Sequence, residues 1–207
     1  SDLLANDMTA ATGALTLLVG GVTEIVKSLS FGDTYIDSAS HLLARDVTSS
    51  NAKITMYVGG TTEIVKSSSY ADTILESQLE AYLRDVVSVA GNVFVTVIDG
   101  IAKIDRIRAL AGNVTVTASQ SIVDSEADLA ADIEAIVITL TSLTGTIGET
   151  YDDLEVDTAD TAVSGVLATS PGNIHITEVA GRLNVSQATS TQGNVRFTVR
   201  ESAAAGE

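Results

Sequence analysis

Short runs in which apolar and polar residues alternate recur along the chain, and four of them follow a Gly-Asn pair. After Gly112-Asn113, for example, the run Val114–Thr117 alternates valine with threonine. A turn signal followed by such alternation predicts a β-strand that buries one face and exposes the other. The Gly-Asn pairs form two sets, which begin at Gly91 and Gly112 and at Gly172 and Gly193, and the offset is the same in both sets.

A longer phrase is repeated near the N-terminus. Residues 19–28 read Val-Gly-Gly-Val-Thr-Glu-Ile-Val-Lys-Ser, and residues 58–67 match nine of these ten positions at an offset of 39. Since 39 is close to two spacings of about 20, one coil of about 20 residues explains both repeats. A single coil of this kind cannot bury its apolar face, so a stack of coils must supply the core. The pattern therefore predicts an all-β parallel β-helix of nine or ten coils, continuous over residues 1–207.

Two segments compete with this interpretation. Residues 79–87 place apolar side chains at helical spacing, but the repeat partner, residues 40–49, interrupts that stripe with Asp46 and Thr48. We therefore predict strands in both copies. The segment Ser125–Ala135 is expected to be a loop or a short helix that leaves the coil.

Composition restricts what fills the core and which partners are possible. Hydrophobic residues make up 45% of the chain but aromatic residues only 4%, so the core must consist of Val, Ile, Leu and Ala. The absence of cysteine excludes disulfides and thiolate zinc sites. The net charge of −16 disfavours nucleic acid and anionic lipid as partners. We expect no membrane insertion, because no apolar run reaches the length of about 18 residues that a spanning helix needs.

Acidic residues are concentrated between Ala109 and Gly181, where there is no Lys or Arg. Hard oxygen ligands at this density suit Ca²⁺, which takes six to eight of them. The competing interpretation is an acidic face exposed to solvent. Two clusters supply the candidate metal ligands, namely Asp124, Glu126, Asp128 and Asp132, and Asp152, Asp153, Glu155 and Asp157. No cofactor is expected apart from possible Ca²⁺.

Three segments resemble a known family. Residues 112–124 (Gly-Asn-Val-Thr-Val-Thr-Ala-Ser-Gln-Ser-Ile-Val-Asp), 138–148 and 172–185 are similar to the repeats of giant secreted bacterial exoproteins of the filamentous-haemagglutinin and adhesin type. The resemblance covers about residues 90–200. It implies a right-handed β-solenoid at the bacterial cell surface, in a filament, surface layer or adhesin. It also implies end-to-end or side-by-side self-association and cell-surface glycans or proteins as partners.

A carbohydrate-binding or polysaccharide-cleaving β-helix is the alternative. A groove lined by Tyr35, Tyr57, Tyr70 or Tyr82 beside carboxylates would favour it. Cleavage of sugars needs two acids facing each other across a cleft, and such sites usually add Trp, Arg or Lys. Because Trp is absent and the acidic region lacks Arg and Lys, we expect no enzymatic activity. The two histidines, His41 and His175, have no sequence neighbours that would make a triad or zinc site and are expected to be surface or packing residues.

Threonine pairs such as Thr115/Thr117 and Thr139/Thr141 are expected to point outward. Flat arrays of threonine are typical of ice-binding solenoids, but threonine is also common in ordinary strands. His175, Arg196 and Phe94 would interrupt the array if they occupy equivalent positions. We therefore interpret these pairs as strand residues.

Overall fold

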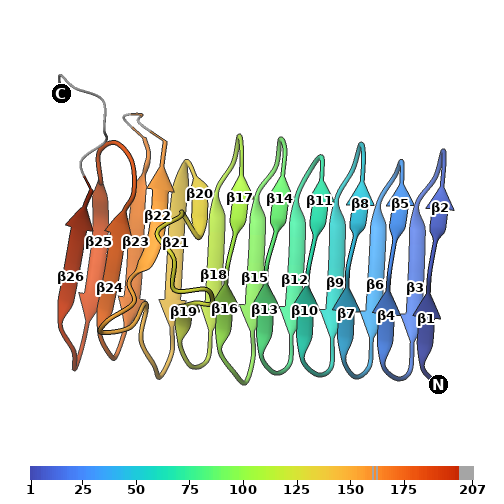
Figure 1. The fold of residues 1–207 in the computed structure, drawn as a ribbon, viewed down its shortest axis with the longest axis horizontal. Helices are drawn as coiled ribbons and strands as arrows, with labels where there is room; N and C mark the ends of the chain where they lie inside the picture. Colours follow the sequence, from blue (N-terminus) through green and yellow to red (C-terminus); the bar gives the residue numbers. More distant parts are fainter. Residues whose placement is uncertain (160, 162, 201–207) are drawn as a thin grey trace.

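The chain is wound into a stack of about ten coils, with about 20 residues in each coil (Figure 1). The computed structural model describes residues 1–159, 161 and 163–200. Neighbouring strands belong to successive coils and pair in parallel. The predicted all-β parallel solenoid is confirmed.

Most coils contribute one strand to each of three parallel sheets. The seven-stranded sheet contains β1 (Leu3–Ala5), β4 (Thr23–Ile25), β7 (Leu42–Ala44), β10 (Thr62–Ile64), β13 (Ala81–Leu83), β16 (Ala102–Ile104) and β19 (Ile122–Asp124). The ten-stranded sheet contains β2 (Met8–Ala10), β5 (Ser28–Ser30), β8 (Val47–Ser49), β11 (Ser67–Ser69), β14 (Val86–Ser88), β17 (Ile107–Ala109), β20 (Ile133–Ala135), β22 (Leu154–Thr158), β24 (Ile174–Glu178) and β26 (Val195–Val199). The nine-stranded sheet contains β3 (Leu15–Val19), β6 (Thr34–Ser38), β9 (Ile54–Val58), β12 (Thr73–Ser77), β15 (Val93–Val97), β18 (Val114–Ala118), β21 (Val137–Ser142), β23 (Gly165–Ser170) and β25 (Val185–Ser190).

The register of the strands explains why the identical phrases recur only in every second coil. Thr23 pairs with Leu42, and Leu42 pairs with Thr62, so the two threonines lie two coils apart with a leucine between them. Coils with hydroxyl side chains at their inner corners therefore alternate with coils that carry aliphatic side chains there. The same alternation occurs in the inward columns Ser28-Val47-Ser67-Val86, Thr34-Ile54-Thr73-Val93 and Ser38-Val58-Ser77-Val97.

Some buried hydroxyls of each polar coil bond to one another, whereas Ser28 Oγ and Ser67 Oγ have no partner among the described residues. Thr23 Oγ1 donates to Ser38 Oγ at 2.9 Å, and Ser38 Oγ donates to the carbonyl of Gly21 at 3.0 Å. The second copy repeats both bonds at 3.0 Å, through Thr62, Ser77 and Gly60. Since a buried hydroxyl without a partner is costly, the repeated phrase maintains a hydrogen-bond network inside the solenoid.

Two inward columns run through the coils as apolar ladders. Neighbouring members pair in the sheets, and nearly all are fully buried. One column contains Ile36, Met56, Leu75, Val95, Val116 and Leu140. The other contains Ile25, Ala44, Ile64, Leu83 and Ile104 and is continued by Asp124.

The Gly-Asn corners work through close packing and a side-chain ladder. A Cβ atom at Gly112 would lie 2.1 Å from the carbonyl oxygen of Gly91, so only glycine allows successive coils to approach here. Gly and Asn tolerate the left-handed backbone, so the sequence predicts that conformation at these corners. This prediction is wrong, because none of the four repeated Gly-Asn pairs has a positive φ. Instead, the Asn92 side chain accepts the N–H of Asn113 at 2.9 Å, and Asn113 accepts that of Val137 at 3.1 Å.

The solenoid changes its cross-section after β19, the last strand of the seven-stranded sheet. Isolated bridges join Ile122 to Ile147 and Ile147 to Ile174, and from β22 onward a coil contains two strands instead of three. The predicted departure from the coil occurs at residues 125–132, which form a loop, and the short-helix alternative is wrong. The extension of this segment to Ala135 is also wrong, because Ile133–Ala135 form β20. The prediction of strands in residues 79–87 is confirmed by β13 and β14.

The outer face of the nine-stranded sheet carries a column of threonines in five successive coils. They are Thr96, Thr117, Thr141, Thr169 and Thr189. His175 and Arg196 lie on β24 and β26 in the ten-stranded sheet, so the expectation that they interrupt this array is wrong. Phe94 does belong to the same face, where it pairs with Thr115.

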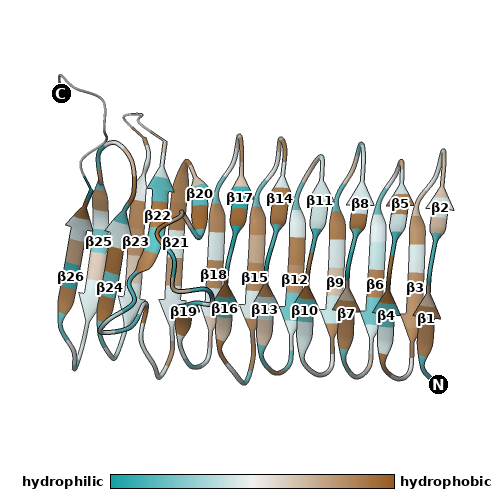
Figure 2. Ribbon diagram, viewed as in Figure 1, coloured by the Kyte–Doolittle hydropathy of each residue, from teal (hydrophilic) through white to brown (hydrophobic). Residues whose placement is uncertain are grey.

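Charged side chains follow the corner between the first two strands of the three-stranded coils, where Figure 2 shows hydrophilic connections. Arg84 pairs with Glu63 at 3.1 Å and Lys66 with Asp46 at 3.8 Å. Glu24 pairs with Arg45 at 3.0 Å. Glu24, Glu63 and Lys66 of the repeated phrase are therefore linked to Arg45, Arg84 and Asp46 of the alternate coils. Each exposed pair contributes only about 0–1 kcal/mol.

Candidate functional site: a buried carboxylate cluster

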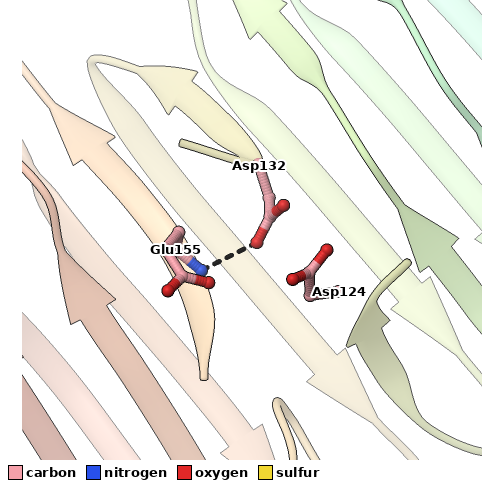
Figure 3. Close-up of side chains that lie close together, drawn as sticks. All are labelled: Asp124, Asp132 and Glu155. Carbon is pink, nitrogen blue, oxygen red and sulfur yellow. Dashed lines mark hydrogen bonds between the residues drawn. The ribbon is translucent and has the colours of Figure 1, made fainter. Parts of the chain in front are cut away.

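Three carboxylates meet where the seven-stranded sheet ends. Asp124 is the last residue of β19, Asp132 directly precedes β20, and Glu155 is the second residue of β22. One carboxylate oxygen from each residue lies within 4.8 Å of the other two, and Figure 3 shows the side chains next to one another. Asp124 occupies the column position that Ile104 fills in the preceding coil. An acidic side chain therefore replaces an aliphatic one at the end of this core ladder.

Backbone hydrogen bonds hold Asp132 and Glu155 together. The N–H of Asp132 donates to the carbonyl of Glu155 at 3.0 Å, and the N–H of Glu155 donates to Asp132 Oδ2 at 2.8 Å (Figure 3). Each residue is only 3% exposed. The position of the two carboxyl groups is therefore fixed by the sheet and by burial.

Arg200, which follows β26, supplies the positive charge that contacts the cluster. Its guanidinium donates to Glu155 Oε1 at 2.6 Å and to the carbonyl of Leu129 at 2.8 Å. Glu155 Oε2 and Asp124 Oδ2 are buried and have no hydrogen-bond partner among the described residues. One arginine thus compensates a group of three carboxylates only in part.

Burial and mutual repulsion favour the protonated forms of two of these acids. Burial raises the pKa of Asp132 to about 9, and the nearby Asp124 carboxylate contributes to this rise. Burial also raises the pKa of Glu155 to about 7, although Arg200 acts in the opposite direction. At neutral pH the cluster therefore keeps a proton on Asp132 unless another positive charge enters it.

The other five predicted metal ligands do not join this cluster. Glu126 accepts from the Tyr82 hydroxyl at 3.1 Å, and Asp128 accepts the N–H of Ala130 at 2.6 Å. Asp153 accepts from Thr177 Oγ1 at 2.7 Å and also pairs with Arg196. Asp152 is partly buried before β22, and Asp157 lies on β22 opposite Glu134. The structure thus brings three of the eight candidates together. Of the other five, Asp152 lies near enough to be repelled by Asp124 and to raise the pKa of Glu155, although it is not part of the group of three.

Arginines from outside the acidic region reach into it. Besides Arg200, Arg196 on β26 pairs with Asp153, and Arg84 lies 3.5 Å from Glu126. Sequence reasoning missed these contacts because it judged the acidic stretch by its own composition. The Gly-Asn repeat could have predicted the position of Arg196. Its offset aligns Arg196 with His175 of the preceding coil, at the edge of the acidic region.

Neither histidine belongs to a catalytic or metal-binding group among the described residues; His41 is exposed, whereas His175 is buried. The Nδ1 atom of His41 accepts the N–H of Thr61 at 3.0 Å. His175 points away from the core, as predicted, but it is only 5% exposed because the chain preceding β22 covers it. Its Nδ1 atom lies 2.7 Å from the carbonyl oxygen of Glu149.

Several surface hollows contain tyrosines beside charged groups, and two of them include tyrosines that the carbohydrate-binding alternative names. One, of about 410 Å³, is lined by Asp33, Tyr35, Lys53 and Tyr57, and the two tyrosine rings are 5.8 Å apart and tilted. The other, of about 500 Å³, includes Tyr82 together with His41, Glu63, Glu80, Arg84 and Lys103. These hollows have the composition that the carbohydrate-binding alternative requires.

Comparison with protein-family models, with curated proteins and with solved structures finds no match. Within the described part of the chain, no helix is long and apolar enough to cross a membrane. Function must therefore be argued from the solenoid and its surface.

Proposed function

We propose that this chain is a structural segment of an extracellular bacterial surface filament, surface layer or adhesin. The observation that carries the proposal is the parallel pairing of successive coils along the whole stack from β1 to β26. Each added coil buries the apolar ladder of the one before it, so stacking produces a stiff body with repeated outer faces. A strand separation of about 4.8 Å gives ten coils a length of roughly 45 Å.

The surface chemistry agrees with this role. A net charge of −16 keeps the solenoid soluble, and several inter-coil ion pairs, such as Asp46 with Lys66 and Asp85 with Arg106, follow one corner. A structural role requires neither a conformational change nor catalytic groups. Self-association along the solenoid axis would extend the same parallel sheets from one copy to the next.

Negative-stain imaging at increasing protein concentration tests this role. We expect particles of constant width whose length increases in steps of one solenoid, roughly 45 Å for ten coils. Single solenoids at every concentration would contradict self-association. Depolymerisation of a polysaccharide by the purified chain would contradict the structural role itself.

Carbohydrate binding is the second candidate function, and the paired rings of Tyr35 and Tyr57 favour it. Aromatic faces and nearby carboxylates are the groups that bind sugar rings and sugar hydroxyls. The hollow is open and lies on the outer face of β6 and β9. A solenoid that carries such a surface would act as an adhesin through glycans, without cleaving them.

Tyr57→Ala tests the glycan surface. If the hollow binds sugars, this substitution should lower the affinity for any glycan that the wild-type chain retains on a glycan array by at least about tenfold, or roughly 1.4 kcal/mol. Phe94→Ala is the matched control, because Phe94 lies outside this hollow and is as exposed as Tyr57 (39% and 37%). Equal binding by the two variants would contradict a glycan site at this position.

A further inference from the structure

The carboxylate cluster has the arrangement of a site for one divalent cation. Two ligands that each lie about 2.4 Å from a Ca²⁺ ion can be at most about 4.8 Å apart. One oxygen from each of Asp124, Asp132 and Glu155 meets this limit, since all three lie within 4.8 Å of one another. The three oxygens therefore meet the pairwise distance limit for ligands of one ion.

A second observation points to a missing ligand. Glu155 is 3% exposed, and its Oε2 atom has no hydrogen-bond partner among the described residues. The same holds for the buried Oδ2 atom of Asp124. A buried carboxylate oxygen without a partner is costly, and a cation bound among the three carboxylates would reduce this cost.

The charge balance agrees with this interpretation. Three carboxylates carry three negative charges when ionised, and Arg200 supplies one positive charge at the Oε1 atom of Glu155. A divalent ion would neutralise the remaining two charges. Ca²⁺ fits better than Mg²⁺, because Ca²⁺ accepts an irregular set of carboxylate oxygens and water, whereas Mg²⁺ demands a near-ideal octahedron.

We propose that Asp124, Asp132 and Glu155 bind a single Ca²⁺ ion. The ligands come from β19, the start of β20 and β22. The ion would therefore link the loop of residues 125–132 to the coils on either side of the change in cross-section. This inference does not depend on the filament role, because it concerns the interior of one chain.

Isothermal titration of the chelator-treated chain with CaCl₂ tests the proposal. We expect one ion per chain, with a dissociation constant of about 10⁻⁴ to 10⁻³ M, as in extracellular calcium modules. We also expect a higher melting temperature with Ca²⁺ and weaker binding of Mg²⁺. No heat of binding and no thermal shift at millimolar Ca²⁺ would overturn the proposal.

Two variants locate the ion. Glu155→Gln should weaken Ca²⁺ binding at least about tenfold, because it removes a charged ligand with little change of shape. Asp128→Asn is the control and should bind as the wild type does, since Asp128 lies outside the cluster in the exposed loop. Unchanged affinity in Glu155→Gln would overturn the assignment.

Arg200→Gln keeps the test decisive if Glu155→Gln does not fold. This variant removes the positive charge that competes with the ion at Glu155, while the three carboxylates remain. Binding should become tighter, and the circular dichroism spectrum should stay that of a β-protein. Weaker binding in a folded Arg200→Gln chain would overturn the assignment, because loss of a competing positive charge cannot weaken an ion that these three carboxylates bind.

Discussion

Replacing Ile64 with alanine is expected to lower the free energy of unfolding by about 2–5 kcal/mol. The side chain of Ile64 is fully buried in the ladder that runs from Ile25 to Ile104. One of its two neighbours in that ladder is Ala44, which is too small to fill the space that the substitution would leave. Two alanines in a row would create a cavity between Ile25 and Leu83.

Urea denaturation followed by circular dichroism measures this loss. Ser67→Ala is the control, because Ser67 lies in the same coil and its buried Oγ atom has no partner among the described residues. That change should alter the unfolding free energy by less than about 1 kcal/mol. Since each coil contacts only its neighbours, hydrogen exchange should place the effect of Ile64→Ala in the adjacent coils. A loss below about 1 kcal/mol for Ile64→Ala would contradict the ladder as the source of stability.

The winding of the chain could be predicted from sequence because its signal is periodic. Each strand recurs once in every coil, so similar side chains lie one above another. The offset of 21 residues spans one coil and the offset of 39 residues spans two, and both therefore give a coil of about 20 residues. Val114 and Val116 were assigned to the interior by alternation alone, and both are fully buried.

The reason why the long phrase returns only in alternate coils could not be predicted. It depends on which residues become neighbours across coils, as Thr23 and Leu42 do. The sequence also does not reveal how near one coil lies to the next. From the sequence, Gly112 is expected to provide an unusual backbone conformation. The structure shows instead that the absence of a Cβ atom at Gly112 prevents a clash with the carbonyl oxygen of Gly91.

The candidate site could be predicted only in part. Composition pointed to the acidic region, and all three residues of the cluster were among the eight candidates. Which three of the eight candidates meet depends on a local change in the fold. The loop of residues 125–132 and the end of the seven-stranded sheet bring Asp124 toward Glu155. Arg200 follows β26 and reaches Glu155 on β22, past β24, and no short-range pattern indicates such a contact.

In the presence of a chelator, Asp132→Asn is expected to stabilise the chain at alkaline pH and to flatten its pH dependence. Burial raises the pKa of Asp132 from 3.8 to about 9, so the folded chain binds this proton more tightly than the unfolded chain does. Stability is then highest below the unfolded pKa of about 4 and falls as pH rises, until the folded pKa is passed. Glu155 adds to the fall between its ordinary pKa of 4.5 and about 7.

Asparagine at position 132 stays neutral and can still accept the N–H of Glu155, as Asp132 Oδ2 does at 2.8 Å. At pH 9 the variant should therefore exceed the wild type by at least about 1.4 kcal/mol, the equivalent of a single pKa unit. At pH 4 the two chains should unfold at similar urea concentrations.

Asp128→Asn is the control variant, because this exposed loop residue can keep its hydrogen bond to the N–H of Ala130 after the change. Equal pH profiles for wild type and Asp132→Asn would show that Asp132 does not hold a proton in the folded chain. Because the measurement is made without Ca²⁺, it separates the proton held by the cluster from the ion proposed to replace it.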